Sequence, residues 1–192
     1  MILEVVKYGH PVLRKRGARV ETVNAETKRL IGDMLETMYV AKGVGLAAQQ
    51  VGHALQLTVL DVRATTDRPS TIEIEGKPAD LLDHMPLVLI NPEVKPVGDP
   101  IPGPEGCLSF PEIFAEITRA EFAEVKALNE KGKPIAFRAG GLLARAIQHE
   151  VDHLNGILFI DRMDRKTKTE FRAELDELQA ETKARLELAK KQ

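Results

Sequence analysis

The segment His149-Glu-Val-Asp-His153 constrains this chain more than any other feature, because it lies inside a stretch with helical spacing. Apolar residues recur there every three or four positions, at Leu143, Ile147, Val151 and Leu154. With the stop signal Asn155-Gly156, this predicts a buried helix over Gly141–Leu154. A four-residue step turns a helix by about 400°, so both imidazoles lie on one face and can bind one metal ion.

Glu150 lies about 100° around this helix from His149, within reach of a water on such a metal. A metal lowers the pKa of its water, and a nearby carboxylate can take the proton. The alternative interpretation is a pair of solvent-facing histidines. It fits less well, because a helix that is apolar on its other faces would then bury unpaired imidazoles.

A catalytic site of this kind usually has three protein ligands and one open position, so a third ligand is required. One candidate is Cys107, in Glu105-Gly-Cys-Leu-Ser-Phe-Pro111, although a lone cysteine also fits an inert core position. The rival is Glu170, which would give a metallopeptidase of the thermolysin type. Glu170 lies in a highly charged stretch, where a surface glutamate is expected.

Length and charge limit the class of protein. The 192 residues suit one domain, and the formal net charge of −2 argues against a broad DNA-binding surface or a polybasic membrane patch. No apolar run reaches the ~18 residues of a membrane span. The single cysteine excludes an intramolecular disulfide and suits a reducing cytosol.

The remaining sequence predicts an α+β fold, with mixed or antiparallel short strands around the central metal-binding helix and a C-terminal helix. A helix starts after Asn24 and ends at Gly43, and a segment of small residues follows to Gly52, where a ligand can approach the backbone closely. Residues 63–85 read as a surface loop or edge hairpin. Strand-like runs are expected at 55–62, 87–94, 114–118, 122–128 and 135–138.

The stretch from Asp164 to Gln192 is highly charged and reads as a solvated helix. Its sparse apolar residues form a narrow docking stripe of Phe171, Leu175 and Leu178. We therefore expect residues 1–165 to form the catalytic domain and 166–192 a charged helical extension of it.

Three segments in this order resemble the motifs of peptide deformylases: Gly43-Val-Gly-Leu-Ala-Ala-Gln-Gln50, Glu105-Gly-Cys-Leu-Ser109 and Gln148-His-Glu-Val-Asp-His153. The segments Tyr8–Arg14 and Gly156–Arg162 are also similar, so the resemblance spans residues 1–165. Only the last helix and the 63–85 loop fall outside it.

The resemblance implies a metal site of Cys107, His149 and His153, with Glu150 as the general acid/base. It further implies that the Gln50 side chain and the Leu108 backbone amide bind the formyl oxygen. The metal would be ferrous iron, for which zinc, nickel or cobalt substitutes. The substrates would be nascent peptides that begin with formyl-methionine, which favours a bacterial cytoplasm. For such an enzyme, with a solvated tail as the alternative, the last helix suggests a ribosome contact through its basic clusters: Arg165, Lys166, Lys168, Lys190 and Lys191.

By the same resemblance, the backbones of Val44, Gly45 and Gly106 pair with the substrate as an added strand. The methionine pocket is formed by Val44, Glu105, Phe114, Leu142 and Arg145 together with the His149 ring. Some family members carry other residue types at Phe114 and Arg145. An alternative of another class is a ribosome-docked or chaperone-like binding module with a dead site, but metal binding alone would require neither Glu150 nor Gln50.

Overall fold

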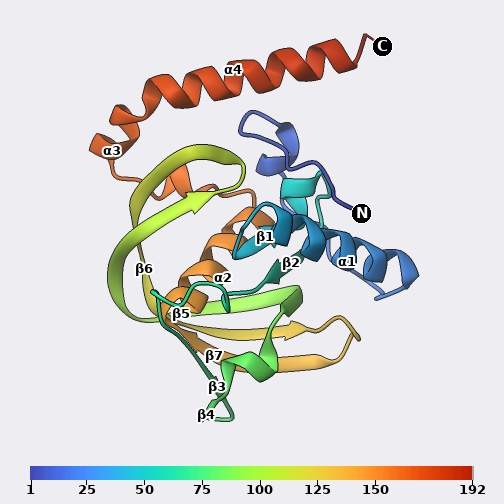
Figure 1. Ribbon diagram of the computed structural model, residues 1–192, viewed down its shortest axis with the longest axis vertical. Coiled ribbons are helices and arrows are strands. Elements are labelled where there is room, and N and C mark those ends of the chain that lie inside the picture. The colour runs from blue at the N-terminus through green and yellow to red at the C-terminus, as the bar shows by residue number, and fades with distance from the viewer. Residues whose placement is uncertain (192) are drawn as a thin grey trace.

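The computed structural model describes residues 1–191 and contains one seven-stranded sheet in the order β1-β2-β5-β6-β7-β3-β4, with each neighbouring pair antiparallel (Figure 1). Its strands are β1 (Gly45–Ala47), β2 (Leu57–Leu60), β3 (Ser70–Ile74), β4 (Lys77–Ala79), β5 (Leu87–Cys107), β6 (Phe110–Leu128) and β7 (Pro134–Gly140). Short 3-10 helices are η1 (Pro11–Arg14), η2 (Ala48–Val51), η3 (Leu81–His84) and η4 (Phe159–Asp161). The α+β fold class is thereby confirmed.

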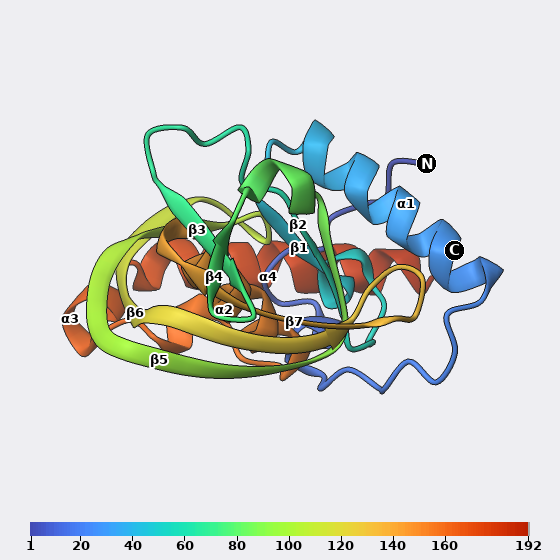
Figure 2. The same ribbon diagram turned by 90° about the horizontal axis from the view of Figure 1, so that it is seen from below.

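Helix α2 (Gly141–Leu154) lies at the centre of the molecule and packs against the sheet (Figures 1 and 2). Its Leu143 and Ile147 are fully buried among side chains of β2, β5, β6 and β7. Gly141 at its start has φ +64° and its backbone lies against Pro69, so this position requires glycine. The predicted bounds of this helix are those observed.

Helix α1 (Ala25–Val40) begins where Asn24 accepts a hydrogen bond from the Thr27 amide at 2.9 Å, as the sequence indicated. Its apolar face packs on β1 and β2, with Met34 and Met38 fully buried. The 63–85 segment contains the β3–β4 hairpin at the edge of the sheet, followed by η3. It is therefore an edge hairpin, one of the two forms expected.

Strands β5 and β6 are much longer than expected, with 21 and 19 residues. The prediction of short strands was wrong here, since β5 continues through a proline-rich stretch where a strand is ordinarily interrupted. Beyond Asn91, whose amide still donates to the Gln56 carbonyl, β5 pairs only with β6, so its other side needs no backbone donors there. Pro100, Pro102 and Pro104 recur at alternate positions, so their backbone nitrogens, which carry no hydrogen, can all face this unpaired edge.

The C-terminal stretch forms two helices rather than the single helix expected, α3 (Arg165–Glu170) and α4 (Arg172–Ala189). The break falls at Phe171, whose side chain packs on the cluster of Val12, Leu13, Phe110 and Phe159. Leu175 and Leu178 join the same cluster, so the docking stripe lies as predicted. Helix α4 thus runs over the N-terminal segment (Figure 1). Gln192 is outside the described residues.

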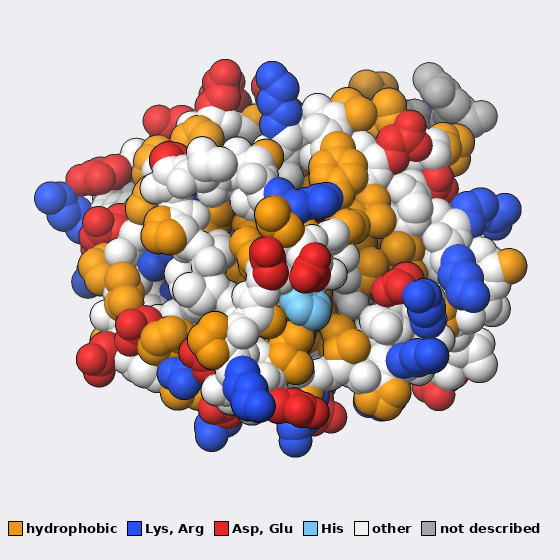
Figure 3. Space-filling model, turned by 60° about the horizontal axis from the view of Figure 1, so that its bottom comes forward, with side chains coloured by type: hydrophobic (Ala, Val, Ile, Leu, Met, Phe, Trp, Pro, Cys, Tyr) orange, Lys and Arg blue, Asp and Glu red, His pale blue; other side chains and the backbone are white. Residues whose placement is uncertain are grey.

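Acidic and basic side chains are intermixed over the face in Figure 3, and no large area of one sign dominates it. Among residues 1–191, no helix is both long enough and apolar enough to cross a membrane.

We expect Leu143→Ala to lower the free energy of unfolding by about 2 to 5 kcal/mol, because it leaves a cavity between α2 and the sheet. Leu143 is 0% exposed. Leu82→Ala, at a position that is 61% exposed, is the matched control and should change stability by at most about 0.5 kcal/mol. Urea denaturation followed by circular dichroism measures both. Equal effects would contradict this account of the core.

Candidate active site

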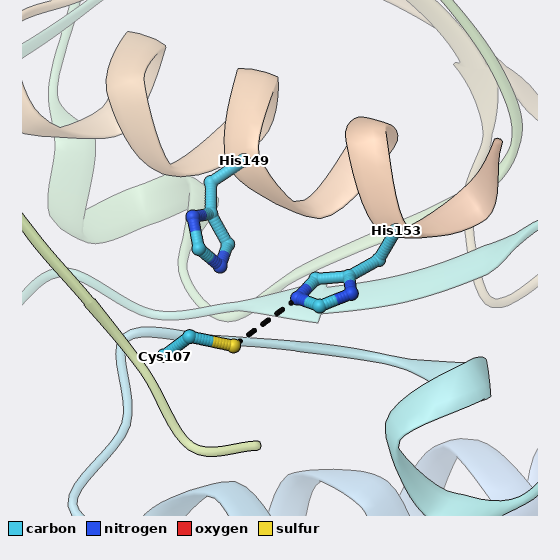
Figure 4. A group of neighbouring side chains, drawn as sticks. All are labelled: Cys107, His149 and His153. Carbon is cyan, nitrogen blue, oxygen red and sulfur yellow. Dashed lines mark hydrogen bonds between the residues drawn. The ribbon is translucent and has the colours of Figure 1, made fainter. Parts of the chain in front are cut away.

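Cys107, His149 and His153 meet where the end of β5 approaches α2 (Figure 4). One ligand atom from each lies within 4.8 Å of the other two, and Nε2 of His153 is 3.3 Å from the Cys107 sulfur. The two imidazoles project from neighbouring turns of α2 toward that sulfur. The structure therefore brings together the three residues expected to bind a metal.

The His149 ring is oriented by Glu105, whose Oε2 lies 3.0 Å from Nδ1. A carboxylate on one ring nitrogen leaves the other free for a metal, which is common around metal-binding histidines. Burial alone would lower the pKa of His149, but its contacts with Cys107 and Glu105 outweigh burial and raise the pKa well above its usual value. The surroundings therefore favour positive charge here, which a bound cation would supply in place of a proton.

His153 is buried, and burial followed by the charge of His149 holds its pKa well below the usual value. Its imidazole is therefore neutral at neutral pH, the form that binds metals. Two imidazoles and one thiol also match the ligand types that divalent iron, cobalt, nickel and zinc accept. The residues thus fit a single transition-metal ion.

Glu150 is only 4% exposed, although it lines a pocket beside these residues. Burial raises the pKa of Glu150 to about 7. Its Oε2 has no hydrogen-bond partner within residues 1–191. A side chain at Gly45 would come within 2.5 Å of Oε1, so the glycine makes room for the carboxylate. A buried acid with an unpartnered oxygen can exchange a proton with a molecule in the pocket.

Gln50, in η2, is fixed at one end because its Oε1 accepts a hydrogen bond from the Ala47 amide at 2.9 Å. Its Nε2 therefore points the other way, 3.5 Å from the Cys107 sulfur and 3.4 Å from the Ser109 hydroxyl. The side chain presents an N–H donor beside the predicted metal position. Leu108, the other expected donor, lines the same pocket.

The pocket has a volume of about 580 Å³. Every site residue expected from the sequence except His153 lines this pocket: Val44, Gly45, Gln50, Glu105, Gly106, Cys107, Leu108, Phe114, Leu142, Arg145, His149 and Glu150. Phe114 is 68% exposed at the rim. Its ring lies over Gly106, where a Cβ would come within 2.6 Å of it.

Arg145 is less available to a ligand than its place in the pocket suggests. Its guanidinium donates to Glu105 at 3.1 Å and to the carbonyls of Ile117 and Ile101, both at 2.7 Å. The arginine therefore joins α2 to β5 and β6, and its buried stem remains to line the pocket.

The sequence interpretation missed Arg119, which is central to the site. Its guanidinium donates to both oxygens of Glu105, at 2.8 and 3.0 Å, and to Asp152 at 2.5 Å. Asp152 in turn accepts from Arg162 at 2.7 Å. Ile113, Ala115 and Ile117 alternate as buried residues of β6, and Arg119 is the next position in this series. An arginine at an inward position indicates a buried ion pair, and this pattern in the sequence could have identified it.

The chain resembles known proteins over nearly its whole length. The family model described as polypeptide deformylase matches residues 2–169. The peptide deformylase of Methylacidiphilum infernorum is 47% identical over 93% of each chain, and that of Opitutus terrae is 43% identical over 98% of each. A crystal structure of a peptide deformylase from Legionella pneumophila superimposes with a TM-score of 0.78, at 36% identity over 92% of this chain and 95% of that one. The chain therefore belongs to the polypeptide deformylase family of metal-dependent hydrolases, which remove the N-formyl group from nascent peptides.

Proposed function

We propose that this protein hydrolyses the formyl amide at the N-terminal methionine of nascent chains, with Glu150 as general acid/base and Gln50 and the Leu108 amide as donors to the formyl oxygen. The products are formate and a free α-amine. The observation that carries this proposal is the convergence of a metal-binding trio, a buried acid and an amide donor on one pocket.

A divalent ion held by Cys107, His149 and His153 would lower the pKa of a water and polarise the formyl carbonyl. Glu150 takes the proton of the attacking water and returns it to the methionine nitrogen as the C–N bond breaks. Its burial suits both roles, because a carboxyl with a pKa of about 7 both accepts and donates a proton near neutral pH.

The formyl oxygen gains negative charge as water adds to the carbon, and donors placed beforehand stabilise that charge. Gln50 fits because Ala47 holds its carbonyl end and leaves its N–H₂ group facing the pocket side. The Leu108 amide would be the second donor, from the residue next to Cys107.

Substrate binding through the backbone would explain how one enzyme accepts many nascent chains. Strand β1 lies at the end of the sheet order, so one of its edges can accept an added strand beside Val44 and Gly45. Gly106 would pair with the peptide from the other side. The methionine side chain would then enter between Phe114, Leu142 and the Arg145 stem.

Glu150→Ala should keep stoichiometric metal and yet lose about 10²- to 10⁴-fold in kcat, because proton transfer is removed while the metal ligands remain. A formyl-Met peptide assay and elemental analysis of the same sample measure the two quantities. Turnover within threefold of the unmodified enzyme would remove Glu150 from the mechanism.

Cys107→Ser should release or loosen the metal, because it replaces a thiolate ligand with a weakly acidic hydroxyl. Glu170→Ala is the matched control for the metallopeptidase alternative and should change neither metal content nor activity. The Glu170 side chain is 62% exposed on α3, near Lys166. Metal loss in the Glu170 variant with retention in the Cys107 variant would favour the peptidase.

We further propose ferrous iron as the native metal. Affinity alone does not select iron over zinc for this ligand set, whereas family resemblance favours iron. Air should inactivate the iron form within hours and oxidise the Cys107 sulfur, whereas zinc cannot change oxidation state. Apo protein refilled with each metal, then followed by activity and by the mass of the Cys107 peptide, tests this. An air-stable iron form with unmodified cysteine would contradict it.

A ribosome contact through the C-terminal helices is also proposed, since Arg165, Lys166 and Lys168 cluster on α3 and Lys190 and Lys191 follow α4. Such a contact would place the enzyme in the bacterial cytoplasm beside its substrates. Replacing these five residues with glutamine should reduce cosedimentation with ribosomes and spare hydrolysis of short peptides. Equal cosedimentation of both proteins would end the idea.

A further inference from the structure

Residues 6–8, here called the N-terminal strap, lie against both segments that supply the proposed oxyanion donors. The Val6 amide donates to the Gln50 carbonyl at 2.9 Å, and the Tyr8 amide donates to the Ser109 carbonyl at 2.9 Å. Between them, the Lys7 ammonium donates to the Leu108 carbonyl at 2.8 Å. Three consecutive residues therefore hold the backbone on both sides of the Cys107 sulfur.

Lys7 differs from its two neighbours because its contact is made by the side chain. It is half-buried and lines the same pocket as Cys107 and Glu150. A charge-assisted bond to a carbonyl is stronger than one between neutral groups, so it restricts the rotation of that peptide more firmly. The Leu108 carbonyl and the Leu108 amide flank the same Cα, and fixing one limits where the other points.

The strap itself is supported from behind by α4. Gly9, directly after the strap, lies so close to this helix that a Cβ there would come within 2.9 Å of the Gln179 carbonyl. Arg185 of the same helix forms an ion pair with Glu4 on the other side of the strap. The strap is therefore enclosed between the pocket wall and the C-terminal helix.

We propose that Lys7 is a positioning residue for formyl hydrolysis, which acts by holding the Leu108 carbonyl so that the Leu108 amide points at the formyl oxygen. This inference rests on the proposed role of the Leu108 amide. A purely structural lysine would instead affect folding, and a lysine that bound the peptide directly would affect KM.

The test compares Lys7→Met, Lys7→Arg and the control Lys15→Met, all loaded with zinc. Met keeps most of the stem without the charge, Arg restores a cationic donor, and Lys15 is an exposed lysine beyond the strap. Removing an oxyanion donor costs about 10²- to 10³-fold, so a donor that remains but loses its support should cost about tenfold in kcat. We expect KM to change by less than about twofold, because the loss is confined to the transition state.

A second readout does not depend on turnover. In ¹⁵N-labelled zinc protein, the backbone amide signals of Leu108 and Ser109 should shift in Lys7→Met, return toward their original positions in Lys7→Arg, and stay unchanged in Lys15→Met. The melting temperature and the metal content of the three variants should match those of the unmodified enzyme.

Several results would overturn the proposal: unchanged kcat in Lys7→Met, a rise in KM that accounts for the whole loss, a loss of stability or metal that parallels the loss of activity, or failure of Lys7→Arg to restore kcat.

The variant Gln50→Leu distinguishes a failure of the Lys7 proposal from a failure of the proposed function. If Gln50→Leu loses turnover while Lys7→Met does not, the formyl oxygen site stands and only the role of Lys7 fails. If neither loses turnover, the donor arrangement itself is wrong.

Discussion

The Glu105 carboxylate joins the three elements from which the site is built. It lies on β5, accepts two hydrogen bonds from Arg119 on β6, and contacts His149 and Arg145 on α2. Burial alone would raise its pKa, but the bonds from His149 and Arg119 outweigh burial and lower the pKa to about 2. A buried carboxylate with this many cationic partners is fully compensated, whereas removing a single partner would leave a costly unpaired charge. The orientation of His149 thus depends on residues from three elements at once.

The long β5–β6 pair curves around α2 (Figures 1 and 2), and arginines connect the pair to the helix. Arg145 binds carbonyls from both strands, and Arg119 donates to Asp152, which lies about two turns further along the same face of the helix. Ion pairs therefore connect the two strands to the helix at two points, one turn before His149 through Arg145 and directly before His153 through Asp152. Cys107 lies two residues beyond Glu105 on β5, so the strand that carries this sulfur also carries the carboxylate that orients His149.

The sequence was sufficient to predict those features that depend on residues close together in the chain. The spacing of Leu143, Ile147 and Leu154, with glycine at both ends, gave the bounds of α2, and the two histidines one turn apart indicated the metal. The resemblance then identified Cys107 and Gln50, which lie far from that helix in the chain. Their placement beside it agrees with this expectation, while their chemical roles remain proposals.

Other features could not be predicted because they depend on contacts between distant segments. The prolines of β5 do not interrupt the strand because β5 has only one neighbouring strand beyond Ile90. This follows from the order of strands in the sheet, which the sequence does not show. Likewise, Arg119 becomes important through carboxylates at positions 105 and 152, and the break at Phe171 follows from the cluster beneath it. Such features are decided by tertiary packing, which overrides local propensity.

The enclosed N-terminal strap has a consequence for how the protein is made. Lys7 binds Leu108 and Gly9 lies against Gln179, so a segment that is made early depends on segments that are made much later. Contacts of such large sequence separation form late, because a long loop must close before they contribute. The sheet and α2 can assemble during synthesis, whereas the wall of the pocket behind Leu108 is completed only when α4 has been released and has docked. In a newly made molecule, the support behind Leu108 is therefore complete only after α4 has left the ribosome.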